Sequence, residues 1–168
     1  MSDAPQWFSG VGTALSEQDG ADAATILDTR GQRAAASVIV VASWRAAADW
    51  TENPALADCW DDDEEEREVL WGRVAAQIGE ATLLAQLTAA TMDAAPRVRA
   101  AALAAAGPAA ADHEAIATAA ASALLALHQY RLAQLAGATV DHPFMRKYAL
   151  FARGRWALGY RVGIYGIY

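Results

Sequence analysis

Cysteine, histidine and long apolar runs are all scarce in this sequence, and each shortage excludes a class of protein. The single cysteine, Cys59, cannot form an internal disulfide, and no basic start leads into an apolar stretch of the kind that forms a secretory signal. The longest uncharged, apolar-leaning stretch, residues 115–129, contains Thr, Ser and His and is shorter than the ~20 strongly apolar residues that span a bilayer. We therefore expect a cytoplasmic protein with no membrane-spanning segment.

Motifs for the common catalytic and metal sites are also missing. There is no phosphate-binding glycine loop, no G-x-S-x-G, no pair of cysteines and no Glu-x-x-His. His113 and His128 are 15 residues apart, about 22 Å along a helix, so they cannot share an ion. Cys59 directly precedes an acidic region, whose field raises the pKa of a thiol and weakens it as a nucleophile. We expect no cofactor, no metal site and no catalytic activity.

Alanine is the most abundant residue, with 44 of the 168 positions. It is the best intrinsic helix former but buries little surface. It therefore favours many helices that pack closely around a thin core, with the six Trp filling the gaps between them. A chain of this length supports one domain. The prediction is an all-α, single-domain helical bundle of about five helices with an extended aromatic and basic C-terminal segment.

Proline, glycine and hydrophobic spacing divide the chain into segments. Residues 1–18 show little periodicity and are predicted to be a flexible N-terminus. A helical domain over residues 19–157 follows, and residues 158–168 are predicted to form an extended tail, a small edge strand or a segment docked on another surface. Within the domain, the predicted helices cover residues 19–29, 32–51, from the acidic run to near Asp93, 96–106, 109–135 and 142–156.

Two of these helices depend on specific local signals. The β-branched run VIVV, residues 38–41, favours a strand, but its Ala-rich flanks and the length of the segment favour a buried helix over residues 32–51. Asp141 suits the N-cap of the last helix, because Pro143 then lies in the first turn. The first assignment opposes local propensity, whereas the second follows it.

Charge is distributed very unevenly along the chain. Residues 1–95 contain five Arg and 17 acidic residues, a net of −12, whereas residues 96–168 contain eight basic and three acidic residues, a net of +5. The two parts sum to the overall charge of −7. Such a charge dipole steers association and orients docking, but it identifies no partner.

The acidic part is concentrated in a run of six carboxylates. We predict an acidic docking edge for a basic partner, consisting of Asp61, Asp62, Asp63, Glu64, Glu65 and Glu66. The same run would also stabilise its own helix, because negative charge near a helix N-terminus meets the positive end of the macrodipole. Both interpretations stay open at the level of sequence.

The C-terminal segment, residues 142–168, combines five cations with seven aromatic side chains and has no acidic side chain. Arg, Trp and Tyr are enriched at protein-interface hot spots, and the same types clamp phosphates and stack on bases. The predicted partner-binding residues are Arg146, Lys147, Tyr148, Phe151, Arg153, Arg155, Trp156, Tyr160 and Arg161. Alternatively, the segment folds back on the acidic part of the chain and completes the domain.

Glu80, His128 and Arg131 form a possible polar cluster. Glu80 interrupts an apolar, Ala-rich stretch, and Arg131 follows His128 by three residues on nearly the same helix face. If the two long helices run antiparallel, Glu80 could form a partly buried pair with either residue. The alternative is that these side chains are solvated and never meet.

Together these features favour a non-enzymatic protein-interaction module: an adaptor, a complex subunit or a neutralising, immunity-type partner. Its partner would be another protein or a second copy of the chain. A nucleic-acid-binding accessory protein acting through residues 142–168 is the second hypothesis, although the acidic remainder of the chain opposes it. A helical-bundle enzyme or cofactor binder around Glu80, His128 and Arg131 is the third.

Overall fold

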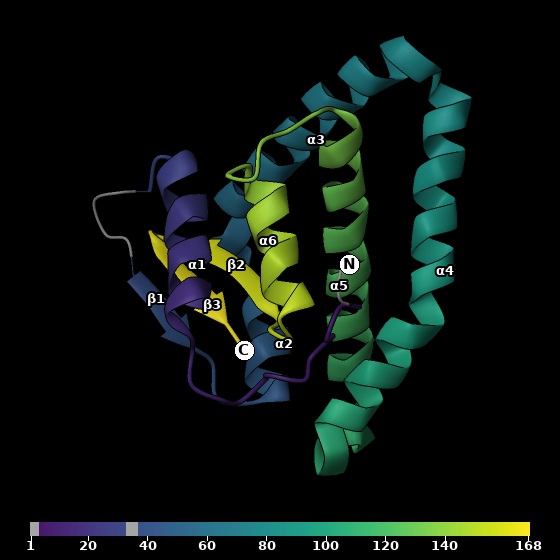
Figure 1. Ribbon diagram of the computed structural model, residues 1–168. Coiled ribbons are helices and arrows are strands. Elements are labelled where there is room, and N and C mark those ends of the chain that lie inside the picture. The colour runs from purple at the N-terminus through teal and green to yellow at the C-terminus, as the bar shows by residue number, and fades with distance from the viewer. Residues whose placement is uncertain (1–3, 33–36) are drawn as a thin grey trace.

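The structure, a computed structural model, describes residues 4–32 and 37–168 and is mostly helical (Figure 1). Within those ranges, six α-helices and two short 3-10 helices accompany a three-stranded sheet. The bounds are α1 Glu17–Thr29, β1 Ser37–Val40, α2 Trp44–Thr51, η2 Pro54–Leu56, α3 Ala57–Ile78, α4 Glu80–Ala106, η3 Gly107–Ala111, α5 His113–Leu135, α6 Pro143–Ala152, β2 Ala157–Arg161 and β3 Ile164–Ile167. The helical prediction is confirmed, but the sheet corrects the all-α class.

The long helices pack through alanine. In Figure 1, α4 and α5 lie side by side, and α6 packs against α5. The face that α5 buries is built largely from small side chains, namely Ala115, Ala119, Ala123, Ala126 and Ala133. Small side chains let helix backbones approach closely, which is how a sequence with so much alanine still forms a dense core. Within the described residues, no helix is both long and apolar enough to cross a membrane.

The sheet corrects the helix predicted over residues 32–51. In its place, the chain forms strand β1 and then α2, which begins after the N-cap Ser43; residues 33–36 of the predicted helix lie outside the described residues. The strand order is β1-β3-β2, with β1 parallel and β2 antiparallel to β3. The local preference of the VIVV run for extended backbone prevails because β3, over 120 residues later, supplies its hydrogen-bonding partner.

The helix predicted from the acidic run to near Asp93 is interrupted earlier, at Gly79. Gly79 has φ +85° and ψ 143°, a conformation that a side chain disfavours, and α4 begins with the next residue. Conversely, Pro96 was predicted to start a new helix but lies inside α4. Pro96 is exposed, as is Met92 one turn earlier, so water can reach the carbonyl that lacks its helical partner.

The last helix is shorter than predicted and is capped by a different residue. It covers Pro143–Ala152, and its N-cap is His142, whose Nδ1 accepts the backbone N–H of Phe144. Asp141 instead pairs with Arg146. The first-turn position of Pro143 was therefore correct, while the cap moved by one residue.

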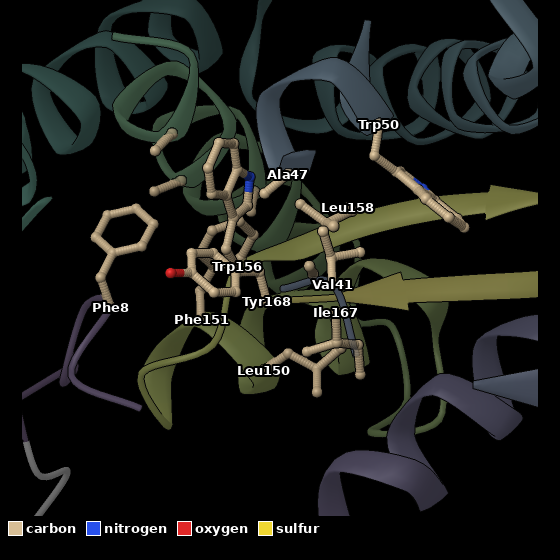
Figure 2. Packing of buried hydrophobic residues seen from close by; sticks show 14 of the residues in the cluster. Phe8, Val41, Ala47, Trp50, Leu150, Phe151, Trp156, Leu158, Ile167 and Tyr168 are labelled. Atoms are coloured by element: carbon tan, nitrogen blue, oxygen red, sulfur yellow. The ribbon is translucent and has the colours of Figure 1, made fainter. Parts of the chain in front are cut away.

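The described residues near both termini pack into the core, outside the helical domain predicted over residues 19–157. Phe8 is fully buried, and Gln6 and Gly10 donate backbone hydrogen bonds to the carbonyls of residues 152 and 154. Residues 158–168 form the β2–β3 hairpin and the buried C-terminal Tyr168. Figure 2 shows Phe8, Trp156 and Tyr168 packed in one cluster with residues of α2 and α6. The described residues 4–16 are thus a packed segment of the domain.

Gly166 in β3 provides a test of this packing. A Cβ added at Gly166 would lie 2.6 Å from Cε2 of the Trp50 indole, whose N–H donates to the Gly159 carbonyl. Gly166→Ala should therefore lower the free energy of unfolding by about 1–3 kcal/mol, as overpacking of a core does. Chemical denaturation followed by circular dichroism measures this change.

Gly72 in α3 is the matched control, because a Cβ there meets nothing within 4 Å. Gly72→Ala should stabilise the protein by about 0.5–1 kcal/mol, since alanine is favoured over glycine in a helix. If both substitutions had the same effect, the close approach of Trp50 to Gly166 would be wrong.

Candidate functional site

Three cations of the C-terminal segment, Arg146, Arg153 and Arg155, contact carboxylates of α1. Nε of Arg153 and Nε of Arg155 each donate to Asp19, both over 2.9 Å. Arg153 also pairs with Asp22, and Nη1 of Arg146 donates to Asp22 over 2.8 Å. Three of the five cations predicted for partner binding are therefore paired with two aspartates of the same chain, and Arg146 also pairs with Asp141.

Asp19 and Asp22 are members of this charge network that sequence reasoning missed. Their side chains are almost completely buried, and Asp19 also completes a capping box with Ser16 at the start of α1. Burial raises the pKa of Asp19, but the hydrogen bonds from Ser16, Arg153 and Arg155 outweigh it and hold the pKa below its ordinary value. The Ser-x-x-Asp spacing was a visible signal for the cap, but nothing local indicated the arginines.

Arg155 is the most heavily hydrogen-bonded of these cations. Besides Asp19, it donates to the carbonyls of Gly10, Thr13 and Ala14 and to the hydroxyl of Thr13. Its residue surface is only 6% exposed. The guanidinium therefore links residues 10–14, α1 and the start of β2 through one buried group.

The aromatic residues of the segment are mostly core residues. Phe151, Trp156 and Tyr160 are at most 2% exposed. Tyr148 stacks on Tyr130 with ring centroids 4.0 Å apart, and Arg161 lies 3.9 Å from the centroid of the Trp50 ring. All nine residues predicted for partner binding are buried or partly buried, so an external partner could reach only the partly exposed ones. These contacts agree with the alternative in which the segment folds back onto the domain.

The six carboxylates of the acidic run divide between the inner and outer faces of α3. Asp62 accepts a hydrogen bond from the Tyr160 hydroxyl. Burial first, and this hydrogen bond second, raise the pKa of Tyr160. Glu66 accepts a hydrogen bond from Nε2 of His142 over 3.0 Å. Asp61, Glu64 and Glu65 are exposed, and of these Glu64 pairs with Arg67. Because residues three and four positions apart share a helix face, half of the run contacts other parts of the domain and the other half faces solvent.

Asp63 is the centre of the inner group. Its Oδ1 accepts from Arg30 over 3.0 Å, and its Oδ2 accepts from Nζ of Lys147 over 3.0 Å. Gln129, which is 3% exposed, accepts a second hydrogen bond from Lys147 and donates weakly to Asp63. Lys147, predicted for partner binding, and Asp63, predicted for the docking edge, thus bind each other.

An outer acidic stripe remains on α3. It consists of Asp58, Asp61, Glu65 and Glu68, spaced so that all four face the same way. All four are exposed, and within the described part of the chain none forms an ion pair or a side-chain hydrogen bond. Trp60, the residue before Asp61, and Val69, the residue after Glu68, are 45% and 54% exposed. Asp58, Glu68 and the two apolar residues were not among the predicted site residues.

A cleft of about 530 Å³ lies between α3 and α5, and we call it the α3–α5 cleft. Its lining comes from α2, η2, α3, α5, α6 and β2, and includes Cys59, Trp60, Leu125, Gln129 and Lys147. Burial, followed by the charge of Asp63, raises the pKa of the Cys59 thiol to about 11. Cys59 is therefore a neutral thiol near pH 7, in the direction that the sequence predicted.

Glu80, His128 and Arg131 do not form the predicted cluster. Glu80 is exposed at the start of α4, Arg131 contacts Gln134 and the Tyr130 ring, and in the described part of the chain no bond joins the three. Burial, and then the charge of Arg67, lowers the pKa of His128. Among the described residues, no group of three or more His, Cys, Asp or Glu is arranged to hold a metal ion.

The buried arginine is the first test of this network. Arg155→Ala should lower the free energy of unfolding by about 3 kcal/mol or more, because it removes one of the two arginines that pair with the buried Asp19 and the guanidinium that donates to the carbonyls of Gly10, Thr13 and Ala14. Arg97→Ala is the control: Arg97 pairs with Asp93 on the exposed face of α4, so its loss should cost less than about 0.5 kcal/mol. Equal losses in urea denaturation would contradict the buried network.

Acid should weaken the same network. Because the folded-state pKa of Asp19 lies below its ordinary value, its ionised form stabilises the fold above that value, and this stabilisation is lost as the pH falls through the folded pKa. Urea denaturation between about pH 5 and pH 2 should show a falling free energy of unfolding. Asp19→Asn should be less stable at neutral pH and show a shallower fall. An unchanged slope in this variant would rule out the assigned role of Asp19.

No protein-family model, no curated protein and no solved structure matches this chain. Its function is therefore inferred from the contacts, charges and cavities described above.

Proposed function

We propose that this chain is a non-enzymatic protein-interaction module that binds a basic protein partner through the outer face of α3. The observation that carries the proposal is the outer acidic stripe, Asp58, Asp61, Glu65 and Glu68, which forms no ion pair with any residue of the ranges 4–32 and 37–168. Trp60, the residue before Asp61, is 45% exposed. Carboxylates of this kind steer a cationic partner, and a neighbouring tryptophan supplies the apolar contact typical of an interface hot spot.

The way the chain uses its cations supports this choice over nucleic acid. Arg146, Lys147, Arg153 and Arg155 each pair with a buried or partly buried aspartate, and Arg161 stacks on Trp50. A phosphate backbone would have to compete with these internal carboxylates and approach a chain with a net charge of −7. The charge left on the outer face of α3 is mainly of the opposite sign, four carboxylates against the exposed Arg73, which favours a basic surface on the partner.

This role covers an adaptor, a complex subunit or a neutralising partner, and a cytoplasmic location is part of the proposal. A neutralising partner fits the charge pattern especially well, because an acidic helix face can cover a cationic surface on the protein that it blocks. Self-association through the same stripe is disfavoured, since two copies would bring like charges together.

Affinity capture with paired charge-reversal variants tests the proposal. The purified chain is used as bait in extract of the source cell, and the captured protein is then titrated against three forms: the native chain, Asp61→Lys/Glu65→Lys and Glu17→Lys/Glu80→Lys. The α3 variant should bind at least about tenfold more weakly, because reversed charges at an interface repel. The control changes the net charge equally at exposed sites on α1 and α4 and should bind within about twofold of the native chain.

Equal weakening of both variants would mean that only net charge matters and would reject the α3 face. The nucleic-acid hypothesis is tested in parallel by fluorescence anisotropy with single-stranded RNA. Submicromolar binding at physiological ionic strength, with a steep loss of affinity as salt is added, would replace a protein partner by nucleic acid.

A further inference from the structure

The α3–α5 cleft has the shape of a ligand site. Its lining runs along α3 from Cys59 to Arg67 and along α5 from Thr118 to Gln129. At 1.5 Å per residue, the α5 wall is about 16 Å long. Leu56 of η2 and the first residues of β2 also line the cleft. A volume of 530 Å³ lies within the range of small-molecule sites.

The walls of the cleft are largely apolar. Leu56 and Leu158 are buried side chains of the lining, while Trp60 and Leu125 are 45% and 50% exposed. Trp60 comes from α3 and Leu125 from α5, so each helix contributes one large apolar side chain that is only half covered. An apolar ligand body between them would remove both from water.

The polar groups of the cleft include one with an unused donor. Lys147 has three N–H groups: one donates to Asp63 over 3.0 Å and another to Gln129 over 3.1 Å. In the described part of the chain, the third has no acceptor, although the Lys147 side chain is only 17% exposed. A partly buried ammonium with an open donor favours a ligand with an acceptor oxygen at that end.

The charges around this donor are already balanced. Lys147 and Arg30 share the carboxylate of Asp63, and Arg30 also lies 3.5 Å from Glu66. At the rim, Glu64 pairs with Arg67, and Glu52 adds one further negative charge. An anionic ligand would find no uncompensated cation, so the electrostatics favour a neutral head group.

We infer that the α3–α5 cleft binds a neutral, largely apolar small molecule that places a carbonyl or hydroxyl oxygen on Nζ of Lys147. The apolar body lies between Trp60 and Leu125, and the oxygen accepts the third N–H. This site goes beyond the proposed function, because its ligand is a small molecule and its polar end does not include the outer acidic stripe.

Prodan, a neutral naphthalene with a ketone at one end, is a suitable fluorescent probe for the purified chain. Saturable binding with a blue-shifted emission and a dissociation constant below about 0.2 mM is expected. Dimethylnaphthylamine, which has the same ring system without the ketone, should bind at least about fivefold more weakly, because it cannot accept from a charged donor. Anilinonaphthalene sulfonate, an anion, should also bind more weakly than Prodan.

Two variants and a control locate the binding. Ser122→Phe fills the cleft from α5 and should abolish the Prodan signal. Lys147→Met should remove the advantage of Prodan over the ketone-free probe, leaving the two equal. Ala85→Phe adds the same ring at an exposed position on α4 away from the cleft, and should change nothing.

Alkylation of Cys59 gives a second readout that does not depend on the stability of the Lys147 variant. Cys59 is the only cysteine and lines the cleft; because its thiol is buried and its pKa is about 11, alkylation by iodoacetamide is followed at alkaline pH, where saturating Prodan should slow it at least about threefold. The same protection should be absent in Ser122→Phe. The alkylation experiment therefore needs only the native chain and Ser122→Phe.

Several results would overturn the inference. These are no saturable Prodan binding, binding that Ser122→Phe leaves intact, or tighter binding of the anionic probe. If Prodan does not bind but a photo-cross-linker at position 122 attaches to a captured protein, the cleft is a binding surface for that protein and the small-molecule inference is wrong. The Prodan titrations measure the cleft with a small molecule and the charge-reversal test measures the outer face of α3 with a protein partner, so failure of one proposal can be told from failure of the other.

Discussion

The buried pairing of Arg153 and Arg155 with Asp19 and Asp22 is the interaction on which the rest of the structure depends. A guanidinium away from water is costly unless its donors are satisfied, and Arg155 satisfies its own with one carboxylate, three carbonyls and a hydroxyl. These contacts bring together residues 10–14, α1 and the start of β2. Trp156, the next residue, is thereby positioned in the aromatic core, and the β2–β3 hairpin follows from that point.

The same pairing changes how the charge of the protein is used. Along the sequence the chain is a dipole, acidic first and basic last, but much of that dipole is cancelled inside the domain. On α3, one face of the acidic run binds Tyr160, Lys147 and His142, and the other face stays in solvent. On the outer face of α3 the exposed charge is mainly negative, while the half-exposed Trp60 of the same helix lines the apolar cleft. We propose two uses for this side of the molecule: protein docking on the outer stripe and a small neutral ligand in the cleft.

Sequence patterns predicted the helices well wherever local signals were sufficient. The helix predicted over residues 109–135 corresponds to α5, Pro143 lies in the first turn of α6, and the direction of the Cys59 pKa was correct. The errors occur where a distant partner decides. β1 is a strand because β3 pairs with it, and the long helix breaks at Gly79, where α4 turns back to pack on α5. The candidate site was predictable to the same extent: the acidic run was visible, but the aspartates that hold the arginines were not, because no local rule couples residues more than 120 positions apart.

By itself, the sequence determined the predominance of helix, the charge of each segment and the residue types that can form interfaces, because propensity, charge and periodicity are properties of neighbouring residues. Only the tertiary structure decided which charges face each other and which face water. The free energy of a charged side chain depends on its surroundings, and in this fold those surroundings come from both ends of the chain. Arg155 could therefore be identified as basic from the sequence, but as a buried structural group only from the fold.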